Sequence, residues 1–171
     1  MTNTNTSAGP ITNRVQRILD GNDPELLAEL PSGYAILGKY QPGPITGCCM
    51  LLPRLGAQGV VVASPNDLDV PMRTQFFSDL VLLGDAIMLV TGSQRINYLV
   101  LCNQVPELHG HCVPRFETED PEKRKQGPFE AYDFGAAPVA DARGAERELH
   151  AALRASLERL LHARDGASPG T

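Results

Sequence analysis

The sequence PELHGHCVPR, at positions 106–115, carries the clearest chemical pattern in the chain. If residues 107–113 form a β-strand, successive side chains point to opposite faces of the sheet. Glu107, His109 and His111 then lie on one face. The other face is formed by Leu108, Gly110 and Cys112. This stretch therefore predicts a row of titratable side chains along one strand.

The residue types in the row suit chemistry at phosphorus. A neutral imidazole is a good nucleophile near pH 7, because its ordinary pKa is about 6.5. His109 would be the nucleophile, and His111 would donate to a phosphate oxygen or to the leaving group. Asn103, Gln104 and Arg115 would supply further donors to the phosphate oxygens, where negative charge develops. Together these residues suit phosphoryl or nucleotidyl transfer through a covalent phosphohistidine.

Two alternatives stay open on these residues alone. Two histidines on a strand are more often hydrogen-bonded surface or core residues than catalysts, because short motifs have a high false-positive rate. Glu107, His109 and His111 could also be three ligands of a metal ion. Periodicity does not choose among these interpretations.

The rest of the sequence predicts a mixture of helices and strands. Apolar spacing of three or four predicts helices over 11–19, 70–90 and from 139 to the C-terminal region. A short helix over 25–30 is predicted from Pro24, which suits the first position of a helix. Strands are predicted over 34–40, 48–52, 60–63, 95–102 and 107–113. Because most strands are joined by short turns, the fold class is α+β, with an antiparallel sheet of about five strands, one long helix and a C-terminal helix.

Length and composition favour a single domain over residues 10–165, with disordered ends at 1–9 and 166–171. The charged run 117–126 is predicted to be a solvated loop, and 127–138 receives no assignment. The last helix has an apolar stripe formed by Leu149, Leu153, Leu157, Leu160 and Leu161. This stripe would pack on the protein's own sheet or on a second copy.

Charge and hydropathy limit the classes of partner. The net charge is −5 and the pI about 5.3, which argues against binding a nucleic acid backbone. The polar start and the lack of an apolar run of about 18 residues predict a soluble, cytoplasmic protein without membrane contact. The four cysteines form no Cys-x-x-Cys pair and are expected to be reduced and buried, so no metal or other cofactor is predicted.

The run from Leu101 to Phe116 resembles the signature of the histidine triad (HIT) family, in which alternating histidines are followed in some branches by Pro-Arg. It is most similar to members with a short Asn-x-Val-Pro lead-in. Upstream, residues 42–47, the apolar run 48–52 and the pair 53–54 are similar, in order, to further elements of that family. The resemblance covers roughly residues 34–116.

The resemblance implies a HIT-like fold, a homodimer, and hydrolysis or transfer of a small-molecule nucleotide at its α-phosphate. His109 falls on the family's nucleophile, and His111 falls on a residue that contacts the phosphate. Gln104 and the adjacent Asn103 fall near a donor to phosphate oxygens. Lys39 falls where an asparagine often contacts ribose.

Glu107 departs from the family pattern, because it occupies the place of the first histidine. An ionised carboxylate only accepts hydrogen bonds and repels a nearby phosphate. Glu107 would therefore turn away or pair with a base such as Arg115, leaving the activity intact, or it would indicate a changed ligand. The second case corresponds to a non-catalytic or repurposed nucleotide- or phosphate-binding protein. The sequence specifies neither the base nor the leaving group, nor whether hydrolysis or transfer completes the reaction.

Overall fold

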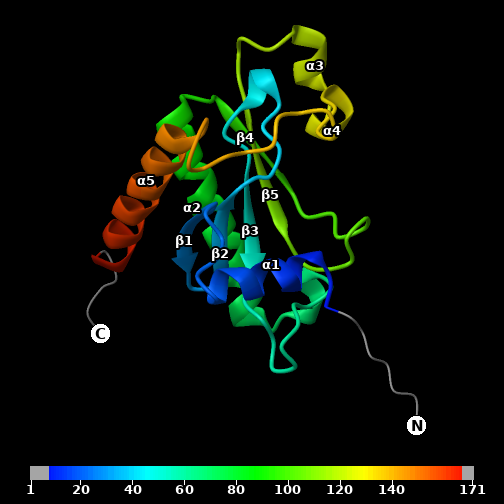
Figure 1. Ribbon diagram of the computed structural model, residues 1–171, viewed down its shortest axis with the longest axis vertical. Coiled ribbons are helices and arrows are strands. Elements are labelled where there is room, and N and C mark those ends of the chain that lie inside the picture. The colour runs from blue at the N-terminus through cyan, green and yellow to red at the C-terminus, as the bar shows by residue number, and fades with distance from the viewer. Residues whose placement is uncertain (1–7, 167–171) are drawn as a thin grey trace.

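The structure is a computed structural model that describes residues 8–166 (Figure 1). Most of the two ends predicted to be disordered, residues 1–7 and 167–171, lie outside the described residues. The elements are α1 (Pro10–Leu19), β1 (Leu26–Leu30), β2 (Gly33–Leu37), η1 (Gly43–Ile45), β3 (Cys49–Pro53), η2 (Pro65–Asp67), α2 (Val70–Thr91), β4 (Arg95–Leu99), β5 (Gly110–Arg115), α3 (Pro121–Lys125), α4 (Pro128–Ala131) and α5 (Arg147–Gly166).

The strands form one five-stranded sheet in the order β1-β2-β3-β5-β4, with every neighbouring pair antiparallel. The predicted α+β class and antiparallel sheet are confirmed, but two segments were wrongly assigned. Residues 26–30 form β1 instead of a helix, because they pair with β2 across a tight turn. Residues 60–63 are not a strand, although Val61 is buried. Short apolar runs do not by themselves distinguish helix from strand.

One face of the sheet is covered by α2 and α5. The long helix α2 buries Phe76, Leu80, Leu83 and Ile87 against the sheet. By length and composition α2 could span a membrane, but packing on the sheet accounts for these apolar residues. The predicted C-terminal helix begins at Arg147, not at position 139, and its leucine stripe packs into this same core.

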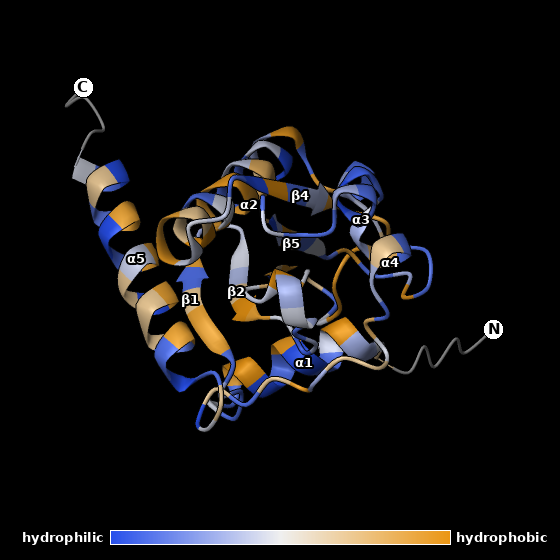
Figure 2. Ribbon diagram, turned by 90° about the horizontal axis from the view of Figure 1, so that it is seen from above, coloured by the Kyte–Doolittle hydropathy of each residue, from blue (hydrophilic) through white to orange (hydrophobic). Residues whose placement is uncertain are grey.

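The opposite face is covered in part by α1, which crosses in front of the strands in Figure 1 and lies across the sheet from α2 in Figure 2. Its apolar residues Ile11, Val15 and Ile18 pack on Tyr34 and Ile36 of β2. The helix covers only part of this face, and the remaining part holds the candidate site.

The charged run after β5 is more ordered than the predicted solvated loop. It contains the short helix α3, whose N-cap is Asp120, and Glu119 within the run is 4% exposed. An ion pair with Arg115 of β5, at 3.0 Å, offsets the cost of burying the Glu119 carboxylate. This ion pair anchors the following segment, which includes α4, near the end of β5.

Candidate functional site

The two histidines lie where the chain enters β5. The strand begins at Gly110, so the predicted strand over 107–113 begins too early. Gly110 faces α2, where an added Cβ would lie 2.7 Å from a Leu80 methyl group, so a larger residue would force the Leu80 side chain to move. His111 pairs with Met50 of β3 and faces the other way, toward the cavity.

The orientation of the His109 ring is set by the main chain. Its Nδ1 lies 2.7 Å from the carbonyl oxygen of Glu107. Because a carbonyl only accepts, Nδ1 must carry the proton, and a neutral His109 then has its lone pair on Nε2. His109 is 8% exposed and lines the cavity. This geometry makes Nε2 the candidate nucleophilic atom.

His111 lies between two aromatic neighbours. Its ring centroid is 4.9 Å from that of His109 and 5.3 Å from that of Phe129, both in edge-to-face geometry. Burial, with a smaller contribution from the charge of His109, lowers the pKa of His111 to about 4. His111 is therefore neutral at pH 7, so it offers one N–H without placing a positive charge beside His109.

Glu107 does not take part in the predicted row. Its carboxylate accepts hydrogen bonds from the backbone N–H groups of Ile11 and Thr12, at 2.9 and 3.0 Å, and from the Thr12 hydroxyl at 2.6 Å. The side chain therefore binds the N-terminus of α1, where the helix dipole favours a negative charge. The expectation that Glu107 turns away is met, but its partner is this helix, not Arg115.

Arg115 also lies elsewhere than predicted for a residue that binds the substrate. Its guanidinium donates to both carboxylate oxygens of Glu119, to Asn97 and to two carbonyl oxygens of the charged segment. These bonds outweigh the effect of burial, which raises the pKa of Glu119, and hold that pKa below its ordinary value. Arg115 does not line the cavity. Its side chain holds the segment after β5 in place.

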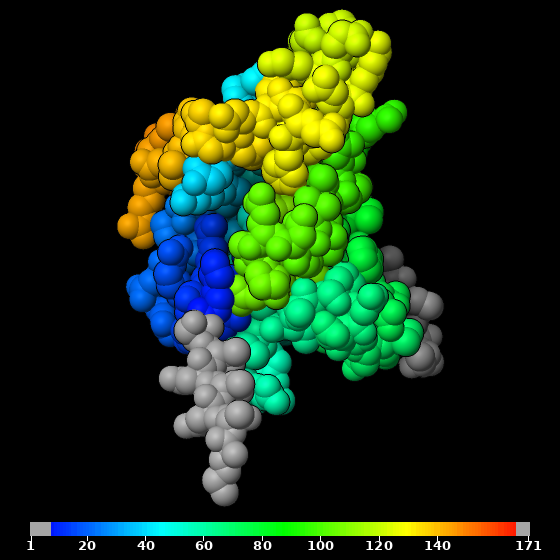
Figure 3. Space-filling model, turned by 90° about the vertical axis from the view of Figure 1, so that its right-hand side faces the viewer, coloured from blue at the N-terminus to red at the C-terminus, as the bar shows by residue number. Residues whose placement is uncertain are grey.

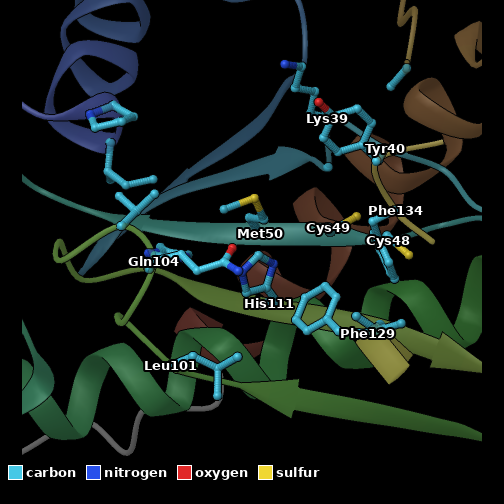
Figure 4. Close-up of a pocket in the computed structure, with 18 of the residues that line it drawn as sticks. Lys39, Tyr40, Cys48, Cys49, Met50, Leu101, Gln104, His111, Phe129 and Phe134 are labelled. Atoms are coloured by element: carbon cyan, nitrogen blue, oxygen red, sulfur yellow. The ribbon is translucent and has the colours of Figure 1, made fainter. Parts of the chain in front are cut away.

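The other predicted site residues surround one cavity of about 1150 Å³. Lys39, Asn103 and Gln104 line it together with both histidines. In the close-up, Lys39 and Tyr40 lie across the cavity from His111, and Gln104 lies beside His111 (Figure 4). The structure thus brings together five of the seven predicted residues, which come from three separate parts of the sequence.

The cavity also has two walls that the sequence did not predict. Phe129, Tyr132 and Phe134 line it, with the Phe129 and Phe134 rings 4.8 Å apart. The chain has only five Phe, four Tyr and no Trp, and three of these aromatic residues lie between positions 129 and 134. This clustering is the sequence signal that could have predicted an aromatic wall. The second wall is α1, which contributes Ile11 and Asn13. No local pattern in α1 indicates this position.

The metal-site alternative finds no geometric support in residues 8–166. They include no group of three His, Cys, Asp or Glu side chains arranged to hold a metal ion. Glu107, the third proposed ligand, is bonded to α1. The four cysteines are free thiols, and burial raises the pKa of Cys48 to about 12, so that thiol stays protonated at neutral pH.

Solved structures share this arrangement of sheet and helices. A histidine triad protein from Bradyrhizobium japonicum superposes with a TM-score of 0.62 at 20% identity, covering 77% of this chain and 89% of its own. A histidine triad protein from Marinobacter aquaeolei gives a TM-score of 0.60 at 18% identity, covering 92% and 98%. A hypothetical histidine triad nucleotide-binding protein from Sulfolobus tokodaii gives 0.63 at 17% identity, covering 86% and 93%.

The chain has the histidine triad fold. No protein-family model and no curated protein sequence matches the chain. Within the histidine triad fold, His109 and His111 stand at the entrance to β5, and Glu107 precedes them.

Proposed function

We propose that the protein is a nucleotide hydrolase or nucleotidyl transferase that acts at an α-phosphate through a covalent His109 intermediate. The observation that carries this proposal is the hydrogen bond from His109 Nδ1 to the Glu107 carbonyl, which leaves Nε2 as the attacking atom in a cavity wall. The name of the Sulfolobus tokodaii neighbour, a nucleotide-binding protein, agrees with a nucleotide ligand.

The proposed reaction has two displacements at phosphorus. In the first, His109 Nε2 forms a P–N bond with the α-phosphorus while the bond to the leaving group breaks, and the leaving group takes up a proton. In the second, water or another acceptor attacks the same phosphorus, loses a proton and breaks the P–N bond. His111 and Gln104 would donate to the phosphate oxygens, and Lys39 would lie beside the nucleoside.

The engagement of Glu107 with α1 removes one objection to this activity. A free carboxylate beside the phosphate would repel it, but this carboxylate accepts three hydrogen bonds from the first turn of a helix. The proposed site therefore has neutral donors and His109 near the phosphate, and Glu107 outside the cavity lining.

Trapping the intermediate tests the proposal. The purified protein is incubated with an α-³²P-labelled adenosine phosphoramidate or dinucleoside polyphosphate, quenched, and analysed for labelled protein and released nucleotide. We expect label on the wild type and none on His109→Ala. Absence of both adduct and turnover with both substrate types, together with equal nucleotide binding by the wild type and His109→Ala, would identify a non-catalytic binding protein instead.

We also propose a cytoplasmic homodimer. Free cysteines suit a reducing compartment. Val70, Phe77, Val81 and Leu89 of α2 are each more than 40% exposed, and β4 beside them is an edge strand. An apolar surface next to an unpaired strand edge fits a second copy of the chain. Light scattering should show a dimer that dissociates in the double variant Phe77→Glu, Val81→Glu, but not in the matched variant Leu19→Glu on α1.

A further inference from the structure

The N-terminus of α1 lacks a cap of its own. Its N-cap residue, Gly9, has no side chain, and the first backbone N–H groups of a helix have no partner within the helix. Ile11 and Thr12 donate these groups to the Glu107 carboxylate, which comes from a residue 95 positions after Thr12. A distant carboxylate thus replaces the usual local cap of this helix.

The Glu107 carboxylate also packs tightly against the backbone at the start of α1. A Cβ added at Gly9 would lie 2.2 Å from Glu107 Oε2, so any larger residue would displace the carboxylate. The Thr12 hydroxyl donates to Glu107 Oε1 and also accepts from the backbone N–H of Val61. Glu107 therefore joins α1 to the loop before β5, and Thr12 extends the contact to a third segment.

Both segments that this contact joins contribute residues to the cavity walls. Ile11, Asn13 and Arg14 of α1 line the cavity, and His109 lines it two residues after Glu107. In the space-filling view, α1 lies directly against the green surface of the segment before β5 (Figure 3). The carbonyl of Glu107 orients His109, whereas its carboxylate holds the helix.

We infer that Glu107 is a positioning residue whose carboxylate holds α1 as a wall of the ligand cavity, so that it controls ligand affinity and not the rate of the chemical step. This inference rests on the proposed function for the nature of the ligand. The two roles are separable, because every substitution of the side chain leaves the carbonyl that orients His109 in place.

Two variants test the contact from its two sides. Glu107→Gln replaces one accepting oxygen with an NH₂ group that faces N–H donors, and Gly9→Ala displaces the carboxylate without changing Glu107. Gly43→Ala is the matched control, because a Cβ there meets nothing within 4 Å. Each protein is compared in AMP binding, in kcat and KM, and in the rate of trypsin cleavage after Arg14 and Arg17 of α1, with fragments identified by mass spectrometry.

We expect both variants to raise the Kd for AMP and KM by about tenfold, equivalent to about 1.4 kcal/mol. Values of kcat should stay within about twofold of the wild type, and cleavage in α1 should accelerate, whereas Gly43→Ala should match the wild type. A fall in kcat at unchanged KM would overturn the inference, because Glu107 would then act in the chemical step. Wild-type cleavage rates in both variants would also overturn it.

The proteolysis measurement separates this inference from the proposed function. If the wild type neither binds AMP nor turns over either labelled substrate, the proposed function fails. Faster cleavage of α1 in Glu107→Gln and Gly9→Ala would still support the holding role of the carboxylate. Unchanged cleavage in that case would overturn both proposals. Because Gly9→Ala leaves the Glu107 side chain intact, misfolding of one variant does not prevent the test.

Discussion

The two faces of the sheet are held to their neighbours by different interactions. On one face, α2 and α5 pack continuously through fully buried side chains such as Leu83, Leu153 and Leu157. On the other, α1 covers only part of the sheet, and polar contacts hold the walls around the uncovered part. Glu107 binds α1, and Arg115 binds Glu119 of the charged segment.

This difference leaves one face of the sheet closed and the other open. Apolar packing is not directional and closes space, whereas a hydrogen-bonded carboxylate can hold an element at a defined place beside an open cavity. The sealed face supplies the main core. The open face has the histidines, and its shape depends on a few polar contacts between distant segments. The following predictions test this division, from the largest expected effect to the smallest.

Loss of the proposed nucleophile, His109, should abolish the proposed activity without affecting the fold. We expect His109→Ala to lower kcat/KM by a factor on the order of 10³ or more, because the variant lacks the proposed attacking atom. Steady-state kinetics and thermal unfolding measure the two effects. His162→Ala, at an exposed position of α5, should retain wild-type rates. Comparable activity in both variants would exclude His109 as the nucleophile.

Breaking the buried ion pair should destabilise the protein strongly. Arg115→Met leaves the Glu119 carboxylate buried without its main partner, and such losses cost about 3–5 kcal/mol of unfolding free energy. Urea denaturation measures the change. Lys125→Met removes an exposed ion pair with Glu122, whose contribution is about 0–1 kcal/mol. Equal midpoints for the two variants would show that the Arg115 pair does not anchor its segment.

Truncation of a leucine on the sealed face should cost stability but leave the catalytic geometry unchanged. Leu83 of α2 is fully buried, so Leu83→Ala should lower the unfolding free energy by about 2–5 kcal/mol. Leu19 at the end of α1 is 53% exposed, and Leu19→Ala should cost only about 0.5 kcal/mol. Denaturation curves compare the two. A KM that changes in Leu83→Ala, at temperatures where it is folded, would contradict the proposed separation of the faces.

Lowering the pH should reduce the unfolding free energy of the protein, because His111 on the open face is held neutral. Burial holds the pKa of folded His111 at about 4, below its ordinary value of 6.5, so the unfolded chain takes up the proton first. The contribution of neutral His111 to stability is therefore present above pH 6.5 and is lost as the pH falls toward 4. Between these values the unfolding free energy of the wild type should fall more steeply than that of His111→Asn. Parallel curves would contradict the buried, neutral state of His111.

Several features were predictable because they depend on local pattern. The spacing of three or four along 70–90 predicted α2, and alternation around Gly110 correctly separated Leu108 and Cys112, in the core, from His111, at the cavity. Residues 25–30 were wrongly predicted, because Pro24 suits the start of a helix but does not show whether the next residues pair with another strand. The partner of β1 is β2, which forms the neighbouring strand through a tight turn.

The sequence by itself determined the antiparallel α+β class, the long core helix and the placing of two histidines beside Asn103 and Gln104. Only the tertiary structure decided that Glu107 binds α1, that Arg115 binds Glu119, and that α1 and the aromatic rings after β5 become cavity walls. The physical reason is the distance along the chain over which each kind of interaction acts. Periodicity reports which face of its own element a side chain occupies, whereas these partners are set by how separate elements pack together.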